Sequence, residues 1–471
     1  MATMSIAAVE VISKETIKPT TPTPYQSRNF SLSLLDQYFP PVYVPIILFY
    51  PAVANSTGSK HHDDLDLLKR SLSETLVHFY PMAGRTEDNM VVDGNDEGID
   101  FIEVKIKGKM CDFMKPDVTL NLLLPSEVVS TKFVKDAQVI VQVNMFDCGG
   151  TAICLCISHK IADLCTMSTF IRNWAGTTNT ARNGGATTNQ NLLPSFDSAS
   201  LFPPSEQLVS QVGVPPTSAS YPTEDSTGDK VVSKRFVFDA VKITSVREKL
   251  QVLMHDKYKC RRPTKVEVVT ALIWKAAIIS TPAGSLSAVH HAVNYRKRMD
   301  PPLLDVSFGN LCGLATVVLP ATTATKNTVL KTSSSISSEI EVQDVLDDQL
   351  IELVAQLRGE INKVKGDNCC MEKMFLSCVS AYDDFLAKNS DVEVKTLPLL
   401  ITSWCKFGLY DADFGWGKPI WVTTNPFIEP SKNIIFMNDT KCGEGIEMWA
   451  NFLEDDMVNF ELNLSEILEL F

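Results

Sequence analysis

The chain has no hydrophobic run long enough to cross a membrane. None of its apolar stretches approaches the roughly 18 residues that a spanning helix needs. Residues 1–20 alternate apolar and charged side chains and lack a signal-peptide core. Residues 467–471 form neither a retention signal nor a peroxisomal address. We therefore expect a cytoplasmic protein without a membrane partner.

Basic residues are too few for a general nucleic-acid partner. The 471 residues include 43 Lys and Arg against 56 Asp and Glu, which gives a formal net charge of −13. An acidic surface disfavours association with phosphate backbones, although it does not exclude a local basic pocket for a phosphorylated cofactor.

Metal-binding and phosphate-binding motifs are also missing. The 12 cysteines are scattered without a pair of CxxC motifs, which favours buried free thiols in a reducing compartment over disulfides or a zinc site. The sequence has no Gly-rich phosphate loop, no GxSxG elbow and no cluster of metal ligands. Hydride transfer, phosphoryl transfer and metal-dependent hydrolysis therefore have no support.

The length of the chain and a shift in composition indicate two domains. A chain of 471 residues exceeds what one hydrophobic core normally supports. Between residues 176 and 229, Gly, Pro, Ser, Thr and Asn dominate and the apolar periodicity stops, as in a linker. We predict domains at 1–175 and 230–471 joined by this linker. A second Ser/Thr-rich stretch, 322–338, predicts a loop before a helix at 342–365.

A predicted hairpin leads to a histidine. The apolar runs 139–146 and 151–157 flank the turn residues 147–150. Residues 164–174 then carry apolar side chains three and four positions apart, which predicts a helix. His159 therefore follows a strand in a connecting turn, where catalytic groups are often found.

His159 and Asp163 form an HxxxD pattern that suits acid–base chemistry. Histidine can take and return a proton near neutral pH, and a carboxylate four residues later can orient it. A structural histidine is the alternative, because this spacing often arises by chance. The other six histidines are predicted to be structural or at the surface: His61, His62, His78, His255, His290 and His291.

A second motif, Asp413-Phe414-Gly415-Trp416-Gly417, stands about 250 residues further along. Together with HxxxD, it resembles the plant BAHD acyltransferases. Further segments match this family in order, from about residue 10 to the C-terminus: 72–76, 79–85, 294–298, 301–303, 308–310 and 402–404.

The resemblance implies an α/β fold and a reaction. The fold would have two chloramphenicol-acetyltransferase-like domains, each a mixed sheet with helices, joined by a crossover linker. A channel between them would admit acyl-CoA from one side and an alcohol from the other. The acyl group would pass directly to the alcohol in a ternary complex, without an acyl-enzyme.

The resemblance also implies roles for individual residues. His159 would be the general base, and Asp163 would be an architectural residue paired with Arg296. Thr402, in a Thr-Ser-Trp segment, is the candidate donor to the developing oxyanion, and a buried strand threonine is the alternative. Trp404 and Ser33 would line the acceptor pocket.

The residues of the second motif are predicted to be structural: Asp413, Gly415, Trp416 and Gly417. Two glycines around a tryptophan fit a tight turn with an anchoring aromatic side chain. In the family this loop lies away from the reaction centre.

Local basic clusters are candidates for the nucleotide end of coenzyme A: Ser233, Lys234, Arg261, Arg262 and Lys265. The cluster of Arg261, Arg262 and Lys265 precedes a predicted helix at 266–278, whose first N–H groups could also face a phosphate. A solvated charged surface is the alternative.

Within the family, the chain is similar to the alkaloid O-acetyltransferases of opium poppy. This implies acetyl-CoA as donor and a secondary hydroxyl of a benzylisoquinoline-derived alkaloid as acceptor, with no metal or prosthetic group. Leu155, Cys156, Leu164 and Cys165 flank the HxxxD motif. At these positions the resemblance to the salutaridinol enzyme implies smaller or polar residues. The departure implies the 13-hydroxyl of 1,13-dihydroxy-N-methylcanadine, in noscapine biosynthesis, as the acceptor, with the 7-hydroxyl of salutaridinol as the alternative. A non-catalytic binding protein with the same fold and a CoA thioesterase are alternatives from other classes. We expect a monomer.

Overall fold

The computed structural model describes residues 9–52, 58–115, 120–131, 137–184, 193–212, 230–258, 261–279, 281, 285–320, 339–364, 366–367, 396–425 and 431–471. The contacts divide the chain into two compact units. Unit 1 comprises Met1–Ser220, Pro301–Cys312 and Lys406–Glu429, and unit 2 comprises Tyr221–Asp300, Gly313–Cys405 and Pro430–Phe471. The predicted boundaries at 175 and 229 stay a prediction, because 185–192 and 213–229 lie outside the described residues.

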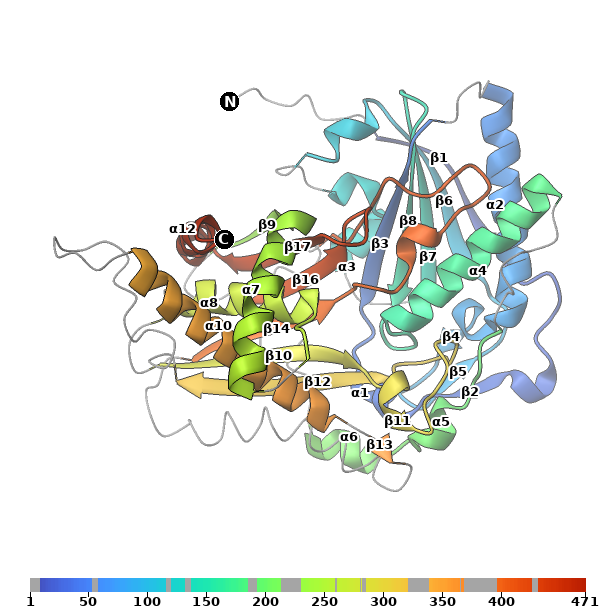
Figure 1. The fold of residues 1–471 in the computed structure, drawn as a ribbon. Helices are drawn as coiled ribbons and strands as arrows, with labels where there is room; N and C mark the ends of the chain where they lie inside the picture. Colours follow the sequence, from blue (N-terminus) through green and yellow to red (C-terminus); the bar gives the residue numbers. More distant parts are fainter. Residues whose placement is uncertain are drawn as a thin grey trace. The chain divides into compact units, whose positions relative to one another are not determined.

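Unit 1 is built on a six-stranded mixed sheet (Figure 1). Its strands, in spatial order, are β1 (Val9–Ile17), β6 (Ile99–Ile106), β7 (Val139–Phe146), β8 (Thr151–Ser158), β3 (Tyr43–Tyr50) and β15 (Trp421–Thr423). Only β6 and β7 run parallel; the other neighbouring pairs are antiparallel. The predicted hairpin is confirmed as β7 and β8. Both strands are buried nearly throughout, as their continuous apolar runs indicate.

Two long helices pack side by side against this sheet: α2 (Gly58–His78) and α4 (Leu164–Asn183) (Figure 1). The buried stripe of α2 follows helical spacing through Leu65, Leu68, Leu72 and Leu76. The helix predicted at 164–174 is confirmed as α4, which continues beyond the predicted range to Asn183. The hydroxyls of Thr177, Thr178 and Thr180 bond to carbonyls four residues back, so these polar side chains find their partners within the helix itself.

Short elements complete unit 1. A small sheet has the order β2 (Asn29–Ser31), β5 (Val91–Asp93) and β4 (Arg85–Thr86). The short helices are α1 (Leu34–Tyr38), α3 (Ser126–Thr131), α5 (Ser198–Leu201) and α6 (Glu206–Val212). The 3₁₀ turns are η1 (Tyr25–Ser27), η2 (Tyr80–Ala83), η3 (Met110–Asp112), η4 (Asn121–Leu123) and η6 (Leu409–Asp411).

Unit 2 contains a second six-stranded mixed sheet. Its order is β12 (Cys312–Pro320), β10 (Leu286–Asn294), β14 (Thr396–Ser403), β16 (Ile434–Asp439), β17 (Ile446–Leu453) and β9 (Val231–Phe238). β10, β14 and β16 are parallel, whereas β17 is antiparallel to both of its neighbours. Two further strands, β11 (Met299–Asp300) and β13 (Gly366–Asp367), pair with each other, and η5 (Arg296–Arg298) precedes β11.

In the part of unit 2 that the structure describes, the helices are α7 (Ala240–Tyr258), α8 (Lys265–Ile279), α10 (Glu339–Lys363) and α12 (Glu454–Glu469). α8 is almost completely buried, and α7, α10 and α12 all contact it. The core of unit 2 is the apolar cluster that these helices form with the sheet. The prediction of an α/β chain with two mixed sheets and helices is confirmed.

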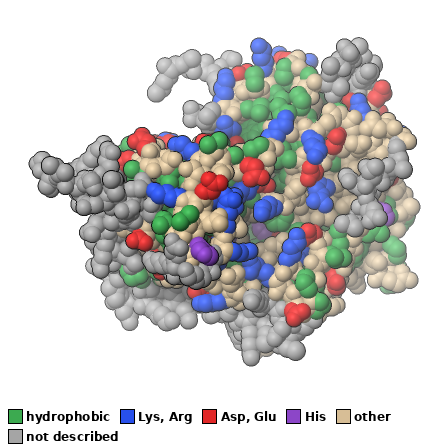
Figure 2. Space-filling model, viewed as in Figure 1, with side chains coloured by type: hydrophobic (Ala, Val, Ile, Leu, Met, Phe, Trp, Pro, Cys, Tyr) green, Lys and Arg blue, Asp and Glu red, His purple; other side chains and the backbone are tan. Residues whose placement is uncertain are grey.

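The predicted loop 322–338 lies outside the described residues. In the described ranges, no helix combines the length and the apolar character that a membrane span requires. The cytoplasmic location and the monomeric state stay predictions. Figure 2 shows Lys and Arg side chains interspersed with Asp and Glu on the face that it displays, so the net charge of −13 does not produce a uniformly acidic surface there.

Candidate active site

His159 lies in the turn that joins β8 to α4 of unit 1. β8 ends at Ser158, and α4 begins immediately after Asp163. The backbone N–H of His159 donates to the carbonyl of Val42 at 2.8 Å, and that of Ser158 donates to the carbonyl of Gln138 at 2.8 Å. The backbone that carries the imidazole is therefore fixed to two neighbouring segments.

Asn310 determines which nitrogen of His159 carries the proton. Nδ1 of His159 lies 3.0 Å from Oδ1 of Asn310. Nδ2 of Asn310 faces only acceptors, which are Oδ1 of Asp36 at 2.9 Å and the carbonyls of His159 at 2.8 Å and Lys160 at 3.3 Å. Because the amide nitrogen donates and the amide oxygen accepts, these contacts fix the orientation of the amide. Nδ1 must then carry the proton, which leaves Nε2 as the basic nitrogen.

Asp36 holds Asn310 in place. Its Oδ1 also accepts from the backbone N–H of Asn310 at 2.7 Å, and its Oδ2 accepts from the backbone N–H and hydroxyl of Ser33 at 2.9 and 2.6 Å. Burial raises the pKa of Asp36 to about 6, although these four hydrogen bonds act to lower it. The carboxylate therefore links α1 to the segment that carries Asn310.

Neither Asp36 nor Asn310 was predicted from the sequence as a site residue. Asn310 stood in the matching segment 308–310, but nothing local connected it to His159. Asp36 stands three residues after Ser33, a spacing that suits a helix capping box, and the structure shows this box at α1. That signal predicts a helix start, and gives no reason to expect a carboxylate beside an asparagine far along the chain.

The environment of His159 keeps its imidazole neutral. The ring of Phe39 stacks on it, with centroids 4.4 Å apart and planes 8° from parallel. Burial lowers the pKa of His159 below its ordinary value and the charge of Lys160 acts in the same direction, whereas the Asp163 charge and the Asn310 hydrogen bond oppose this. A neutral imidazole with a free Nε2 lone pair is the form that can accept a proton.

Asp163 supports the backbone around the site. Its Oδ1 accepts from the N–H of Thr166 at 3.0 Å and caps α4, and its Oδ2 accepts from the N–H of Leu311 at 3.0 Å. Its pairing with Arg296 stays a prediction. Arg296 belongs to unit 2, where it is buried and donates from its backbone N–H to Oδ1 of Asn294 at 3.0 Å.

Replacing Asp163 with asparagine should lower the free energy of unfolding by about 1–3 kcal/mol, because one backbone N–H would face an amide NH₂ instead of an oxygen. Denaturant unfolding measures this loss, and activity should fall with it. Asp239→Asn is the matched control, since only one oxygen of Asp239 caps α7 at Lys242 and asparagine caps about as well. A fully stable Asp163→Asn variant that lost only turnover would instead indicate a catalytic carboxylate.

The other candidates for the reaction centre divide between the units. Ser33 is buried in unit 1 with its hydroxyl bonded to Asp36 in the α1 capping box. Thr402 and Trp404 belong to unit 2, where Thr402 is half-buried in β14 opposite Phe436 of β16. The indole of Trp404 lies edge-on to the ring of Phe436, with centroids 6.2 Å apart. Their roles toward an acceptor or an oxyanion stay predictions.

The Asp413–Gly417 segment forms the predicted tight turn. Oδ1 of Asp413 accepts from the N–H groups of Gly415 and Gly417 at 2.8 and 2.9 Å, and the two glycines have φ of 98° and 107°. A Cβ on Gly415 would lie 2.7 Å from Cδ of Arg182. The turn therefore needs glycine for its backbone conformation and, at Gly415, for space.

This turn contacts the far end of α4 from His159. The amide of Asn179 donates to the carbonyl of Asp413 at 3.2 Å, and the Arg182 guanidinium lies 5.3 Å from the Trp416 ring centre. A helical rise of about 1.5 Å per residue places Asn179 roughly 24 Å along the axis from Asp163. This supports a structural role for Asp413, Gly415, Trp416 and Gly417, which stays a prediction.

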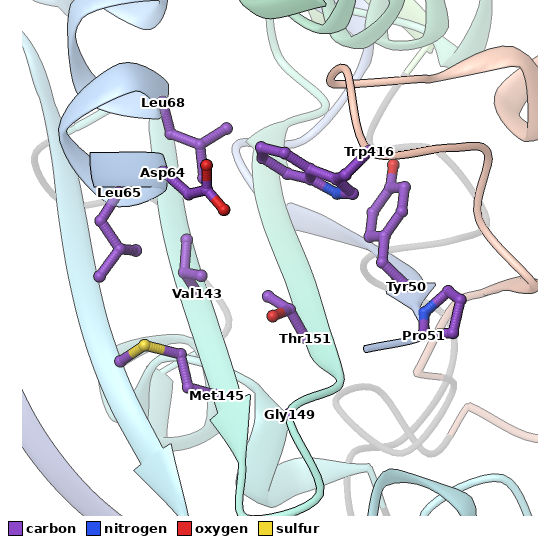
Figure 3. Close-up of a pocket in the computed structure, with 10 residues that line it drawn as sticks. All are labelled: Tyr50, Pro51, Asp64, Leu65, Leu68, Val143, Met145, Gly149, Thr151 and Trp416. Atoms are coloured by element: carbon purple, nitrogen blue, oxygen red, sulfur yellow. The ribbon is translucent and has the colours of Figure 1, made fainter. Parts of the chain in front are cut away.

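A pocket opens beside Trp416, and Figure 3 shows its lining. The lining residues come from α2, the end of β3 and the residue after it, β7, the β7–β8 turn, β8 and the turn after Asp413: Tyr50, Pro51, Asp64, Leu65, Leu68, Val143, Met145, Gly149, Thr151 and Trp416. His159 is not among them, so this pocket is separate from the candidate base.

The predicted cofactor residues have different surroundings in unit 2. Lys234 pairs with Glu461, and Ser233 donates to Oδ1 of Asn451 at 2.7 Å. Lys265 is buried and donates to Oδ1 of Asp439 at 2.6 Å and to two backbone carbonyls. Arg261 and Arg262 are exposed just before α8. A cofactor role stays a prediction for all five residues. In the described ranges, no group of three or more His, Cys, Asp or Glu side chains is arranged to hold a metal ion.

Comparisons with known proteins agree with the motifs. The model of the Transferase family matches residues 7–467. The (13S,14R)-1,13-dihydroxy-N-methylcanadine 13-O-acetyltransferase of Papaver somniferum is 70% identical, and salutaridinol 7-O-acetyltransferase of the same plant is 66% identical; each alignment covers 100% of both chains. The crystal structure of vinorine synthase superposes with a TM-score of 0.74 at 30% identity, covering 98% of both chains. The resemblance inferred from the motifs is confirmed, and the chain belongs to this transferase family, the BAHD acyltransferases.

Proposed function

We propose that the chain transfers the acetyl group of acetyl-CoA to a secondary hydroxyl of a benzylisoquinoline-derived alkaloid. The observation that carries the mechanism is the Asn310 contact, which orients His159 and leaves Nε2 unprotonated. The observation that carries the substrate class is the 70% identity to an alkaloid O-acetyltransferase over the whole chain.

His159 acts as the general base in a direct transfer. Its Nε2 takes the proton of the acceptor hydroxyl as the hydroxyl oxygen attacks the thioester carbonyl. The tetrahedral intermediate collapses to the ester and expels the coenzyme A thiolate, which takes the proton back from the imidazolium. Oδ1 of Asn310 and the negative charge of Asp163 stabilise that imidazolium. No acyl-enzyme forms.

Thr402 and two arginines are our candidates for binding the donor. Thr402 stands in the Thr-Ser-Trp segment, and we propose that its hydroxyl donates to the thioester oxygen as that oxygen becomes negative. Arg261 and Arg262 are exposed ahead of α8 and suit the phosphates at the nucleotide end of coenzyme A, and the only acidic partner of Arg262 among the described residues is the exposed Glu248 at 3.6 Å. Lys265 is the weaker candidate, because its ammonium already bonds to Asp439 and two carbonyls.

The preferred acceptor is the 13-hydroxyl of 1,13-dihydroxy-N-methylcanadine, with salutaridinol as the alternative. The higher identity to the 13-O-acetyltransferase, 70% against 66%, supports this order. Cys156 and Cys165 are buried on either side of the HxxxD turn, and Leu155 and Leu164 lie next to them in the sequence. We propose that these side chains shape the acceptor pocket.

The purified protein should acetylate 1,13-dihydroxy-N-methylcanadine with a kcat/KM at least about tenfold above that for salutaridinol, since one methylene of misfit in an apolar pocket costs about 1–3 kcal/mol. Mass spectrometry of the products with acetyl-CoA measures both values. Release of thiol without an alkaloid is the control for a thioesterase. Equal or reversed values would assign salutaridinol, and failure to acetylate either alcohol would contradict the proposed acceptor class.

A further inference from the structure

Lys160, the residue after His159, is a buried lysine with three hydrogen-bond acceptors around its ammonium. Nζ donates to the carbonyls of Asp36 at 3.2 Å and Gln37 at 3.0 Å, and to Oδ1 of Asn89 at 2.7 Å. Burial lowers the pKa of Lys160 to about 8, and the charge of Asp36 partly opposes this. At neutral pH the side chain is therefore mainly an ammonium, with one N–H for each acceptor.

These acceptors tie Lys160 to the end of α1. The carbonyl of Asp36 also accepts from the backbone N–H of Phe39 at 3.2 Å, so Lys160 adds to the hydrogen bonds that close the end of α1, where a cation complements the negative end of the helix. The amide of Asn89 donates to the carbonyl of Gln37 at 3.2 Å, and Nε2 of Gln37 donates to the carbonyl of Asn89 at 3.0 Å. Lys160 and Asn89 thus hold the end of α1 against the turn that carries His159.

The end of α1 bears directly on the imidazole in two ways. Phe39, the residue after α1, stacks its ring on the ring of His159. Asp36 holds Asn310, whose oxygen accepts from Nδ1 of His159. A shift at the end of α1 would therefore displace both the Phe39 ring that stacks on His159 and the Asn310 oxygen that accepts from Nδ1.

We propose that Lys160 is a positioning residue for the reaction. Its ammonium fixes the end of α1 so that Phe39 and the Asp36–Asn310 pair hold the His159 ring in its reactive orientation. The inference rests on the proposed role of His159 as the base. Lys160 is the second residue of the HxxxD motif, and the motif alone gives this position no role.

Lys160→Met is the direct test, because methionine keeps a long apolar side chain and removes all three donors. We expect kcat to fall at least about tenfold while KM for acetyl-CoA stays within about twofold, since a misplacement of 1 Å can cost about 10²-fold in rate. Lys69→Met is the matched control. Lys69 on α2 also bonds with its ammonium, to Glu15 and Glu103 at 2.6 Å, and its loss should lower stability without changing kcat.

A double-mutant cycle tests whether Lys160 acts through the ring of Phe39. If it does, the fold reduction in kcat of the Lys160→Met/Phe39→Leu double variant should be much smaller than the product of the fold reductions in the two single variants. An unchanged kcat in folded Lys160→Met would overturn the inference. Effects that simply multiply would overturn the part that runs through Phe39. If Lys160→Met does not fold, Lys160→Gln takes its place under the same criteria.

His159→Ala, measured in parallel, distinguishes the role of Lys160 from the role of His159 as the base. An inactive His159→Ala beside a fully active Lys160→Met would refute the role of Lys160 and leave the base intact. An active His159→Ala would refute both.

Discussion

His159→Ala should reduce the single-turnover rate of acetyl transfer at least ~10²-fold, because a positioned general base contributes about 10²- to 10⁴-fold. Rapid mixing with acetyl-CoA and the alkaloid measures this rate, and circular dichroism checks the fold. His78→Ala is the matched control, since His78 is exposed at the end of α2 and should not affect the rate. Retention of most activity by His159→Ala would reject the proposed mechanism.

The pH dependence provides a second check on the same residue. The base must be neutral, and burial lowers the pKa of His159 below its ordinary 6.5. Activity should therefore rise with pH through a midpoint below 6.5 and be fully present above it. Asp36, with a pKa of about 6, loses its charge in the same acidic range and should steepen this limb. An acid limb centred above 6.5 would contradict this assignment.

Local patterns were sufficient to predict the segment around His159. The β7–β8 hairpin needs only two apolar runs and a Gly-Gly turn, and α4 starts where Asp163 caps it. The end of α4 could not be predicted in this way. The composition of this segment is that of a linker, because it contains Thr177, Thr178 and Thr180. In the structure their hydroxyls bond to carbonyls of α4 itself. Trp174, one turn before Thr178, contacts α2 through a hydrogen bond to the carbonyl of Leu68.

The contacts that orient His159 could not be predicted, because they join residues far apart in the sequence. Asn310 is 151 residues from His159, and Asp36 is 274 residues from Asn310. Gly309 shows how closely the segment that carries Asn310 packs against Asp36. Its φ of 117° disfavours side chains, and a Cβ there would lie 3.3 Å from Oδ2 of Asp36. Neither periodicity nor composition carries information about such packing.

Asn310→Ala should lower kcat by about 10²-fold with little change in the KM for acetyl-CoA. Without Oδ1, the ring of His159 is free to turn and to place its proton on Nε2, which is the wrong tautomer for a base. Steady-state kinetics with both substrates separates kcat from KM. Asn144→Ala is the matched control. Asn144 is also buried and bonded through both ends of its amide, within β7, so its loss should lower stability without a comparable fall in kcat.

Asn310→Asp distinguishes orientation from simple packing. When its new carboxyl group is protonated, it can accept from Nδ1 of His159 and donate to Asp36, as the amide does. When it ionises, two carboxylates meet in a buried site, and the arrangement is disfavoured. Asn310→Asp should therefore keep more activity than Asn310→Ala near pH 6 and lose that advantage as the pH rises. Equal, pH-independent losses in the two variants would mean that Asn310 contributes only its volume, and that another group sets the tautomer of His159.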